Sequence, residues 1–297
     1  MKLSQAAEPF LTHCAVERFY SAQSIQKVQD CLKSRILPVL GNRELEVLTR
    51  LDILDFRQTL KEAGLGIARQ YSLLMTLKLL LKFCRTVLKV DCLDPVEIKL
   101  PRRPPPEVEF LTNEEIERVL AAIDTTKLTG LRLRALVEVL LASGMRISEA
   151  LSLDRDSIDL RKNEARIVGK GNKPRTVFFS DRSLVWVHRY LQRRADDCPV
   201  LFATTWNPPR RWPRVDISPV FRHLRQKAGI TKHLTPHLLR HTFCTNLLHN
   251  GADITFIKAL AGHQDIQTTA RYYLGITTDS LKQVLERCQN YGWKDAA

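Results

Sequence analysis

The residues best suited to chemistry lie near the C-terminal end of this 297-residue chain. They are the segment Thr235-Pro-His237-Leu-Leu-Arg240-His241, the pair Gly262-His263 and the segment Thr268-Thr269-Ala-Arg-Tyr272-Tyr273. Thr235 followed by Pro236 is typical of a helix start, with threonine as the N-cap and proline at the first helical position. His237 and Arg240 are three residues apart, so they would share one face of that helix. A phosphate bound there would meet an imidazole, a cation and backbone N–H groups, and a later tyrosine could act as a nucleophile.

A second interpretation of the same segment is a metal site. His237 and His241 are four residues apart, a spacing at which two histidines on one helix can bind zinc. The chain has no HExxH sequence, and its seven cysteines form no CxxC pair, which also argues against a disulfide framework. We therefore expect His241 to be a structural neighbour of the site and expect no metal or other cofactor. A zinc-dependent nuclease, the alternative, would lose its activity in EDTA.

The charge of the chain indicates a polyanionic partner. Its net charge is +14, with 15 Lys/Arg against 11 Asp/Glu in residues 1–100 and therefore 31 against 21 in residues 101–297. Because both halves are basic, the balance favours a protein that touches nucleic acid with two domains. No apolar run is long enough to span a bilayer and no signal peptide is visible, so we expect a cytoplasmic protein without a membrane partner.

The elements that must position the chemistry fall into two predicted domains. Apolar residues recur at helical spacing in four segments of residues 1–98, which predicts a small helical bundle. Residues 99–110 include Pro101-Arg-Arg-Pro-Pro-Pro106 and are expected to form an extended linker. Residues 111–297 mix helical segments with short β-like segments. The predicted fold is mainly α, with a small antiparallel β-sheet in the second domain.

Two connections in the second domain carry clustered basic residues. Residues 164–168 and 175–179 read as strands, and Gly169-Lys170-Gly171-Asn-Lys173-Pro174 between them predicts a hairpin turn with two lysines at its tip. Residues 204–214 hold Trp206, Trp212 and three arginines among prolines. That mixture suits a nucleic-acid contact, but it equally suits a packed Pro/Trp loop, and the sequence leaves both interpretations open.

Each of these patterns is weak alone, but their order along the chain is specific. The stretches concerned are Ser143-Gly-Met-Arg146-Ile-Ser-Glu149-Ala-Leu151, Val168-Gly-Lys170-Gly-Asn-Lys173, Thr235-Pro-His237-Leu-Leu-Arg240-His241-Thr242-Phe243, Leu260-Ala-Gly262-His263 and Thr268-Thr269-Ala-Arg-Tyr272. Together they resemble the tyrosine recombinase (phage integrase) family over nearly the whole chain. In that family the nucleophile follows the histidine of the Gly-His pair by nine residues, which selects Tyr272 over Tyr273 because 272 − 263 = 9. The N-terminal part matches by its helix pattern only.

The resemblance implies a function and a role for each site residue. A family member cleaves and rejoins duplex DNA at specific sites through a 3′-phosphotyrosyl intermediate and exchanges strands through a Holliday junction. Arg146, Arg240 and His263 would bind the scissile phosphate, His237 would take the proton of Tyr272, and Lys170 would protonate the leaving oxygen. Glu149 would orient its neighbours. The family needs neither metal nor ATP, and the absence of a P-loop sequence agrees with this.

The resemblance also implies partners. Family members act as tetramers on double-stranded recombination sites, sometimes with a paralogous recombinase. The segment Asp279-Ser-Leu281-x-x-Val284-Leu285-x-x-Cys288 has the apolar stripe of an amphipathic helix that docks on the next subunit, or packs on its own domain. The compact chain suggests a Xer-like, integron or mobile-element integrase. Type IB topoisomerases, telomere resolvases and a DNA-binding regulator that has lost catalysis remain alternatives.

Overall fold

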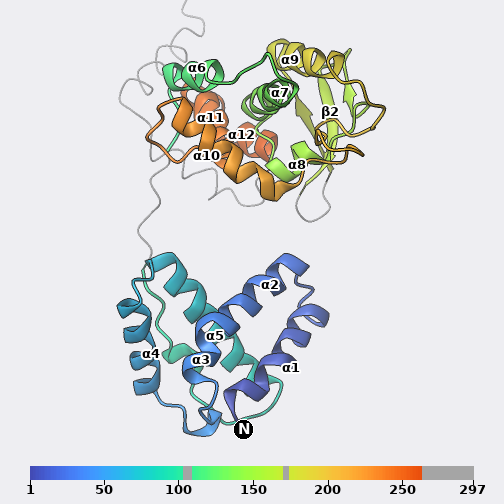
Figure 1. Ribbon diagram of the computed structural model, residues 1–297. Coiled ribbons are helices and arrows are strands. Elements are labelled where there is room, and N and C mark those ends of the chain that lie inside the picture. Colours follow the sequence, from blue (N-terminus) through green and yellow to red (C-terminus); the bar gives the residue numbers. More distant parts are fainter. Residues whose placement is uncertain (103–108, 170–173, 263–297) are drawn as a thin grey trace, which may run out of the picture. The chain divides into compact units, whose positions relative to one another are not determined.

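The computed structural model describes residues 1–102, 109–169 and 174–262 of the chain. Contacts divide the chain into two compact units between Pro106 and Glu107, and Figure 1 shows the elements of each. The predictions made for Lys170, His263, Tyr272, Tyr273 and the 279–288 segment fall outside the described residues. In the described ranges, no helix has the length and apolar character needed to cross a membrane.

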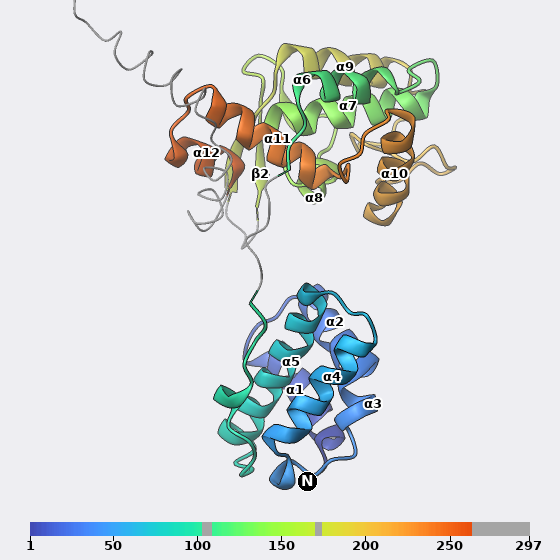
Figure 2. The ribbon, with the colours of Figure 1, turned by 90° about the vertical axis from the view of Figure 1, so that its left-hand side faces the viewer.

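The first unit is built from helices only, as far as it is described. They are α1 (Leu3–Val16), α2 (Ala22–Cys31), a π-helical turn (Leu32–Ile36), α3 (Leu37–Leu40), α4 (Arg50–Glu62) and α5 (Ile67–Thr86), with short 3-10 turns at Leu45–Val47 and Pro95–Glu97. α5 contacts α1, α2 and α4 and buries Leu73, Leu77 and Leu80 completely. Phe10 of α1 and Phe56 of α4 belong to the same buried cluster. The four helical segments predicted from apolar spacing are therefore confirmed, and their shared core lies around α5 (Figure 2).

The second unit combines helices with one small sheet. Its elements are α6 (Asn113–Ala121), α7 (Leu128–Ser143), α8 (Ile147–Ser152), β1 (Ile158–Asp159), β2 (Glu164–Val168), β3 (Pro174–Phe178), α9 (Asp181–Gln192), a 3-10 turn (Arg214–Asp216), α10 (Ile217–Lys227), α11 (Pro236–His249) and α12 (Ile254–Ala261). The strands pair antiparallel in the order β1-β2-β3. The mainly helical fold with a small antiparallel sheet is thus the one that the sequence predicts.

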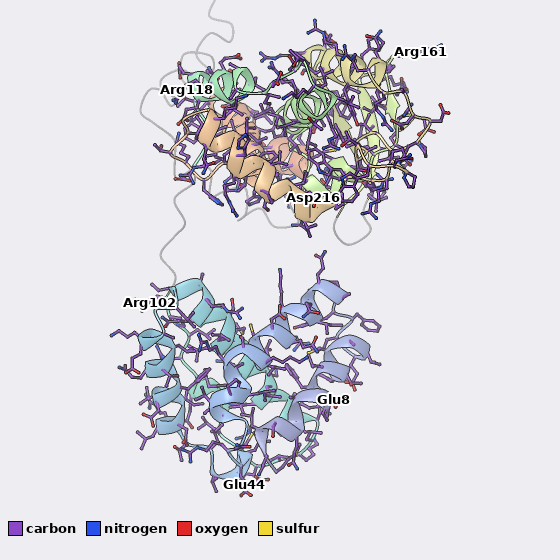
Figure 3. All side chains as sticks on the ribbon, viewed as in Figure 1. Glu8, Glu44, Arg102, Arg118, Arg161 and Asp216 are labelled. Carbon is purple, nitrogen blue, oxygen red and sulfur yellow. The ribbon has the colours of Figure 1, made fainter. Side chains whose placement is uncertain are left out.

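The long helix α7 is the centre of the second unit. It contacts α8, α9, α11 and β3, and most of its residues are buried, which explains why its sequence is apolar on nearly every side. The sheet covers this core with alternate residues, since Ala165 and Ile167 are buried while Arg166 and Val168 between and after them are exposed. Side chains fill the interior of each unit in Figure 3, where the labelled Glu8, Glu44 and Arg161 lie at the surface.

The turn from α7 to α8 depends on a glycine. Gly144 caps α7 in the left-handed conformation, with φ of +60°, and its N–H donates to the carbonyl of Leu140. A Cβ atom at this position would lie 2.2 Å from the Cδ1 atom of Phe243 on α11. A larger residue is therefore opposed both by the backbone and by the neighbouring helix. This close approach places the end of α7, just before α8, against α11.

Candidate active site

Arg146 lies at the start of α8 and is held there by Glu149. The residue is the N-cap of α8, and its backbone N–H donates to Oε2 of Glu149 at 2.8 Å. Its Nη1 donates to Oε1 of the same carboxylate at 2.9 Å, and its Nη2 donates to the carbonyl oxygen of Gly262 at 3.0 Å. These two bonds use two of the five N–H donors of a guanidinium group. The Arg146 side chain is 31% exposed, so its remaining donors can meet a ligand from solvent.

Arg240 is anchored on the same two turns as Arg146. Its Nη1 donates to the carbonyl oxygen of Gly144 at 2.6 Å, and its Nη2 donates to the carbonyl oxygen of Ala261. Gly144 lies two residues before Arg146, and Ala261 lies one residue before Gly262, which binds Arg146. The structure therefore brings together two arginines that are far apart in the sequence.

Arg240 differs from Arg146 in its burial. It is only 1% exposed, and burial, followed by the positive charge of Arg146, lowers its pKa to about 10. The group nevertheless stays protonated at neutral pH. A phosphate oxygen can reach Arg146 directly, whereas it can reach Arg240 only after that side chain is uncovered.

His237 lies three residues before Arg240, on the same face of α11. Thr235 caps the helix by accepting the N–H of Leu238 on its Oγ1 at 3.1 Å, and Pro236 is the first helical residue, as predicted. Partial desolvation of the ring, followed by the charges of Arg240 and Arg146, lowers the pKa of His237. The residue is exposed at the surface. His237 is therefore neutral at physiological pH and has a ring nitrogen that can accept a proton.

His241 packs against His237, with 4.3 Å between the ring centroids. Burial and then the neighbouring His237 lower its pKa to about 4. In the described ranges, no group of three or more His, Cys, Asp or Glu side chains is placed to hold a metal ion. Its packing makes His241 a structural neighbour of His237.

A further arginine, Arg175 on β3, joins the cluster. Its Nη1 and Nη2 donate to Oε1 and Oε2 of Glu149 at 2.9 and 3.0 Å. Burial acts to raise the pKa of Glu149, but hydrogen bonds from Arg175 and Arg146 outweigh it, so the pKa lies below its usual value. The carboxylate is therefore ionised, and the orienting role predicted for Glu149 matches its contacts. Sequence reasoning missed Arg175, because a strand arginine beside a lysine-rich turn gives no signal of a buried partner 26 residues earlier.

The three arginines and Glu149 give the site a net positive charge of two by simple counting. Such fixed donors can stabilise negative charge that develops on a phosphoryl group. The paired ends of β2 and β3 lie beside this cluster, since Val168 pairs with Pro174 and the next residue is Arg175. Lys170 belongs to the connection between these paired residues. Its position, like those of His263 and Tyr272, lies outside the described residues.

The basic loop of residues 204–214 has one packed side and one exposed side. Trp212 is 4% exposed and stacks against Arg132, whose Cζ lies 3.7 Å from the ring centroid. Trp206 is 52% exposed and stacks against Arg210, with a Cζ-to-centroid distance of 4.6 Å. Arg211 fixes the loop to the end of α8 by donating to the carbonyls of Leu151 and Leu153 and to Asp154. The packed interpretation therefore holds for Trp212, and the exposed Trp206 leaves the nucleic-acid contact a prediction.

An open hollow of about 530 Å³ lies between this loop and α8. It is lined by Ser148, Ser152, Arg210, Arg211 and Arg214, together with apolar residues. Ser148 and Ser152 belong to the helix that Arg146 begins. Hydroxyl and cationic groups therefore continue from Arg146 along α8 to the exposed side of the basic loop.

Comparison with known proteins agrees with this fold. The model of the phage integrase family matches residues 109–277. Tyrosine recombinase XerD of Pseudomonas putida is 36% identical over 197 residues, which are 62% of this chain and 63% of that protein. XerD of Proteus mirabilis is 33% identical over 79% of this chain and 76% of its own length. XerD of Listeria monocytogenes serotype 4b is 27% identical over 96% of this chain and 98% of its own length.

Solved structures show the same fold. The crystal structure of XerA recombinase is 26% identical, with a TM-score of 0.52 over 96% of this chain and 98% of that one. The Tn1549 transposon integrase in complex with transposon right-end DNA is 20% identical, with a TM-score of 0.81 over 97% of this chain and 100% of that one. The chain belongs to the phage integrase family. The activity of this class is that of a tyrosine-type site-specific DNA recombinase, which cleaves and rejoins DNA strands.

Proposed function

We propose that this chain cleaves one strand of a specific duplex site by attack of Tyr272 on the scissile phosphate, and then joins that strand to a partner duplex. The observation that carries the proposal is the common anchoring of Arg146 and Arg240 on the α7–α8 turn and the end of α12. Two guanidinium groups held in this way can each bind a non-bridging phosphate oxygen. The site thereby stabilises the transition state with fixed charges and without a bound metal.

Each bond and proton is accounted for in the proposed cleavage step. The phenolic oxygen of Tyr272 forms a bond to phosphorus, and the bond from phosphorus to the 5′ oxygen breaks. The phenolic proton passes to His237, which is neutral because its pKa is lowered. Lys170 donates a proton to the leaving 5′ oxygen, and His263 adds a hydrogen bond to the phosphate. The 5′ hydroxyl of the partner strand then attacks the phosphotyrosyl ester and reverses these transfers.

Because Arg240 is buried, the proposed mechanism requires that DNA binding uncover its side chain. DNA first meets Arg146, whose side chain is accessible, and the second contact forms when Arg240 becomes uncovered. A site that completes itself only on DNA would not act on free phosphodiesters. With this order of contacts, we expect the chain to prefer duplex DNA to a free phosphodiester as substrate.

We also propose a role for each domain and the partners of the chain. Residues 1–98 form a core-binding domain, residues 99–110 a linker, and residues 111–297 the catalytic domain. The exposed Trp206–Arg210 pair and the hollow beside α8 contact the DNA backbone near the scissile phosphate. The chain acts in the cytoplasm as a homotetramer on two duplex sites, or with a paralogous recombinase, through a Holliday junction. The 279–288 segment docks on the neighbouring subunit.

The decisive experiment is covalent trapping on a nicked suicide duplex that carries the recombination site. Loss of the short fragment after the nick prevents religation, so the phosphotyrosyl protein accumulates and runs as a shifted band on a denaturing gel. We expect the band with the wild-type chain and with Tyr273→Phe, and no band with Tyr272→Phe. A band that survives in Tyr272→Phe and disappears in Tyr273→Phe would move the nucleophile by one residue.

Two controls separate recombination from related activities. A band that vanishes in EDTA would point to a metal-dependent nuclease and would contradict the proposal. Relaxation of a supercoiled plasmid without any recombination site would indicate a type IB topoisomerase instead. We expect strand exchange only when two sites are present.

A further inference from the structure

Glu149 is shared by two arginines, and the sharing is unequal. Its Oε1 accepts hydrogen bonds from Nη1 of Arg146 and Nη1 of Arg175, both at 2.9 Å. Its Oε2 accepts the backbone N–H of Arg146 at 2.8 Å and Nη2 of Arg175 at 3.0 Å. Arg175 therefore binds both carboxylate oxygens with its two Nη atoms, which fixes the plane of the carboxylate. The Arg146 side chain binds only one of these oxygens.

Burial shows which arginine neutralises Glu149. The side chains of Glu149 and Arg175 are 5% and 12% exposed, and that of Arg146 is 31% exposed. A buried carboxylate needs a counter-charge of its own, and the more deeply buried, bidentate Arg175 supplies it. The positive charge of Arg146 is then left for a phosphate. Without Arg175, Arg146 would be the counter-ion of Glu149 and would be drawn toward it.

Arg175 also contacts the second group that holds Arg146. A Cβ atom at Gly262 would lie 2.8 Å from Nη1 and 2.9 Å from Cδ of Arg175, so the two residues are in close contact. Nη2 of Arg146 donates to the carbonyl oxygen of Gly262. Both groups that bind the Arg146 guanidinium, the Glu149 carboxylate and the Gly262 carbonyl, therefore belong to residues that touch Arg175.

We propose that Arg175 is a positioning residue of the cleavage reaction, which neutralises Glu149 and thereby directs the charge of Arg146 to the scissile phosphate. This inference rests on the proposed function. Arg175 itself does not touch the phosphate. Lysine cannot replace it fully, because a single ammonium group cannot bind both carboxylate oxygens in the same plane.

The test compares single-turnover cleavage of two suicide duplexes by Arg175→Gln and Arg175→Lys. One duplex has an ordinary scissile phosphate, and in the other a methylphosphonate replaces one charged non-bridging oxygen. A variant that has lost the function of Arg146 should lose less rate on the uncharged substrate, because less negative charge then needs stabilisation. Arg146→Ala serves as the reference for this behaviour.

We expect Arg175→Gln to slow cleavage of the ordinary phosphate by about 10- to 100-fold, which is less than the loss of a direct phosphate donor. On the methylphosphonate the defect should shrink to about threefold or less, as it does for Arg146→Ala, on the same scale of charge stabilisation. Arg175→Lys should fall between the wild type and Arg175→Gln. The matched control is Arg166→Gln, which removes the same charge from an exposed position on the paired strand β2.

An equal defect of Arg175→Gln on both substrates would overturn the inference, because a purely structural role would slow both reactions alike. Recovery with a sulfur leaving group, but not with the methylphosphonate, would also overturn it, since Arg175 would then act on protonation of the leaving oxygen. If Arg175→Gln does not fold, the same comparison is made with Arg175→Lys. The wild-type adduct reports on the proposed function separately, because its absence contradicts that function whatever the variants do.

Discussion

Arg240 and Arg146 donate hydrogen bonds to the carbonyl groups of two consecutive residues, Ala261 and Gly262, at the end of α12. Arg240 also binds the carbonyl of Gly144, two residues before Arg146. The separation of the two guanidinium groups is therefore set by main-chain atoms and not by side chains alone. A change that moves the α7–α8 turn or the end of α12 should misplace both groups together.

Replacement of Gly144 tests this dependence on the turn. In Gly144→Ala the residue would keep a φ of +60°, and its Cβ would meet the Phe243 ring at 2.2 Å. We expect the free energy of unfolding to fall by about 2–5 kcal/mol, the sum of left-handed backbone strain and overpacking. Cleavage in the trapping assay should fall by at least about tenfold at a temperature where the variant is folded, because a 1 Å misplacement can cost about 100-fold.

Gly64→Ala is the matched control for Gly144→Ala. Gly64 has a similar φ of +67°, but a Cβ atom added there would have no neighbour within 4 Å. Its substitution should cost only the backbone strain of about 1–2 kcal/mol and should leave the cleavage rate unchanged. Equal losses of stability and activity in the two variants would show that contact with Phe243 plays no part.

The lowered pKa of His237 predicts the pH at which the cleavage rate falls on the acidic side, here called the acidic limb of the pH–rate profile. A proton acceptor must be neutral, and desolvation with the charges of Arg240 and Arg146 keeps His237 neutral to a lower pH than an ordinary histidine. The midpoint of the acidic limb in single-turnover cleavage should therefore lie below 6.5, the ordinary value. His237→Gln should be slower and should lose this limb, whereas His233→Gln, a surface change, should keep it. A wild-type midpoint at or above 6.5 would contradict the assignment.

The parts of the site that sequence patterns revealed are local, and the parts that they missed depend on contacts between distant segments. Thr235 and Pro236 predicted the start of α11 because capping depends on a few neighbouring residues. The position of Glu149, three residues after Arg146, likewise predicted an orienting role. The role of Arg175 was not predicted, because its pairing with Glu149 exists only after β3 has packed beside α8. The burial of Arg240 is also a property of the folded chain alone.

The pKa of His241 predicts how stability depends on pH. In the folded protein burial and His237 lower this pKa from 6.5 to about 4, so the unfolded chain binds more protons between these two values. The stabilising contribution is complete above 6.5 and is lost as the pH falls through the folded pKa. His241→Asn should flatten the dependence of unfolding free energy on pH by up to about 1.4 kcal/mol per pH unit in this window. Chemical denaturation at several pH values measures the slope, with His233→Asn as the surface control.

Two exposed residues of the basic loop, Arg210 and Trp206, should contribute to DNA binding in different ways. Arg210 carries a charge, so Arg210→Ala should lower the slope of log affinity against log salt by about 0.9, the effect of one phosphate contact. Trp206 is uncharged, 52% exposed and stacked on Arg210, so Trp206→Ala should weaken binding by about 0.5–1 kcal/mol through loss of this cation–π contact, with little change in slope. Arg161→Ala, at an exposed turn between β1 and β2, controls for the loss of one surface charge. Fluorescence anisotropy over a salt series measures these slopes. Equal slopes for wild type and Arg210→Ala would exclude this loop from the DNA-binding surface, because a phosphate contact always releases counterions.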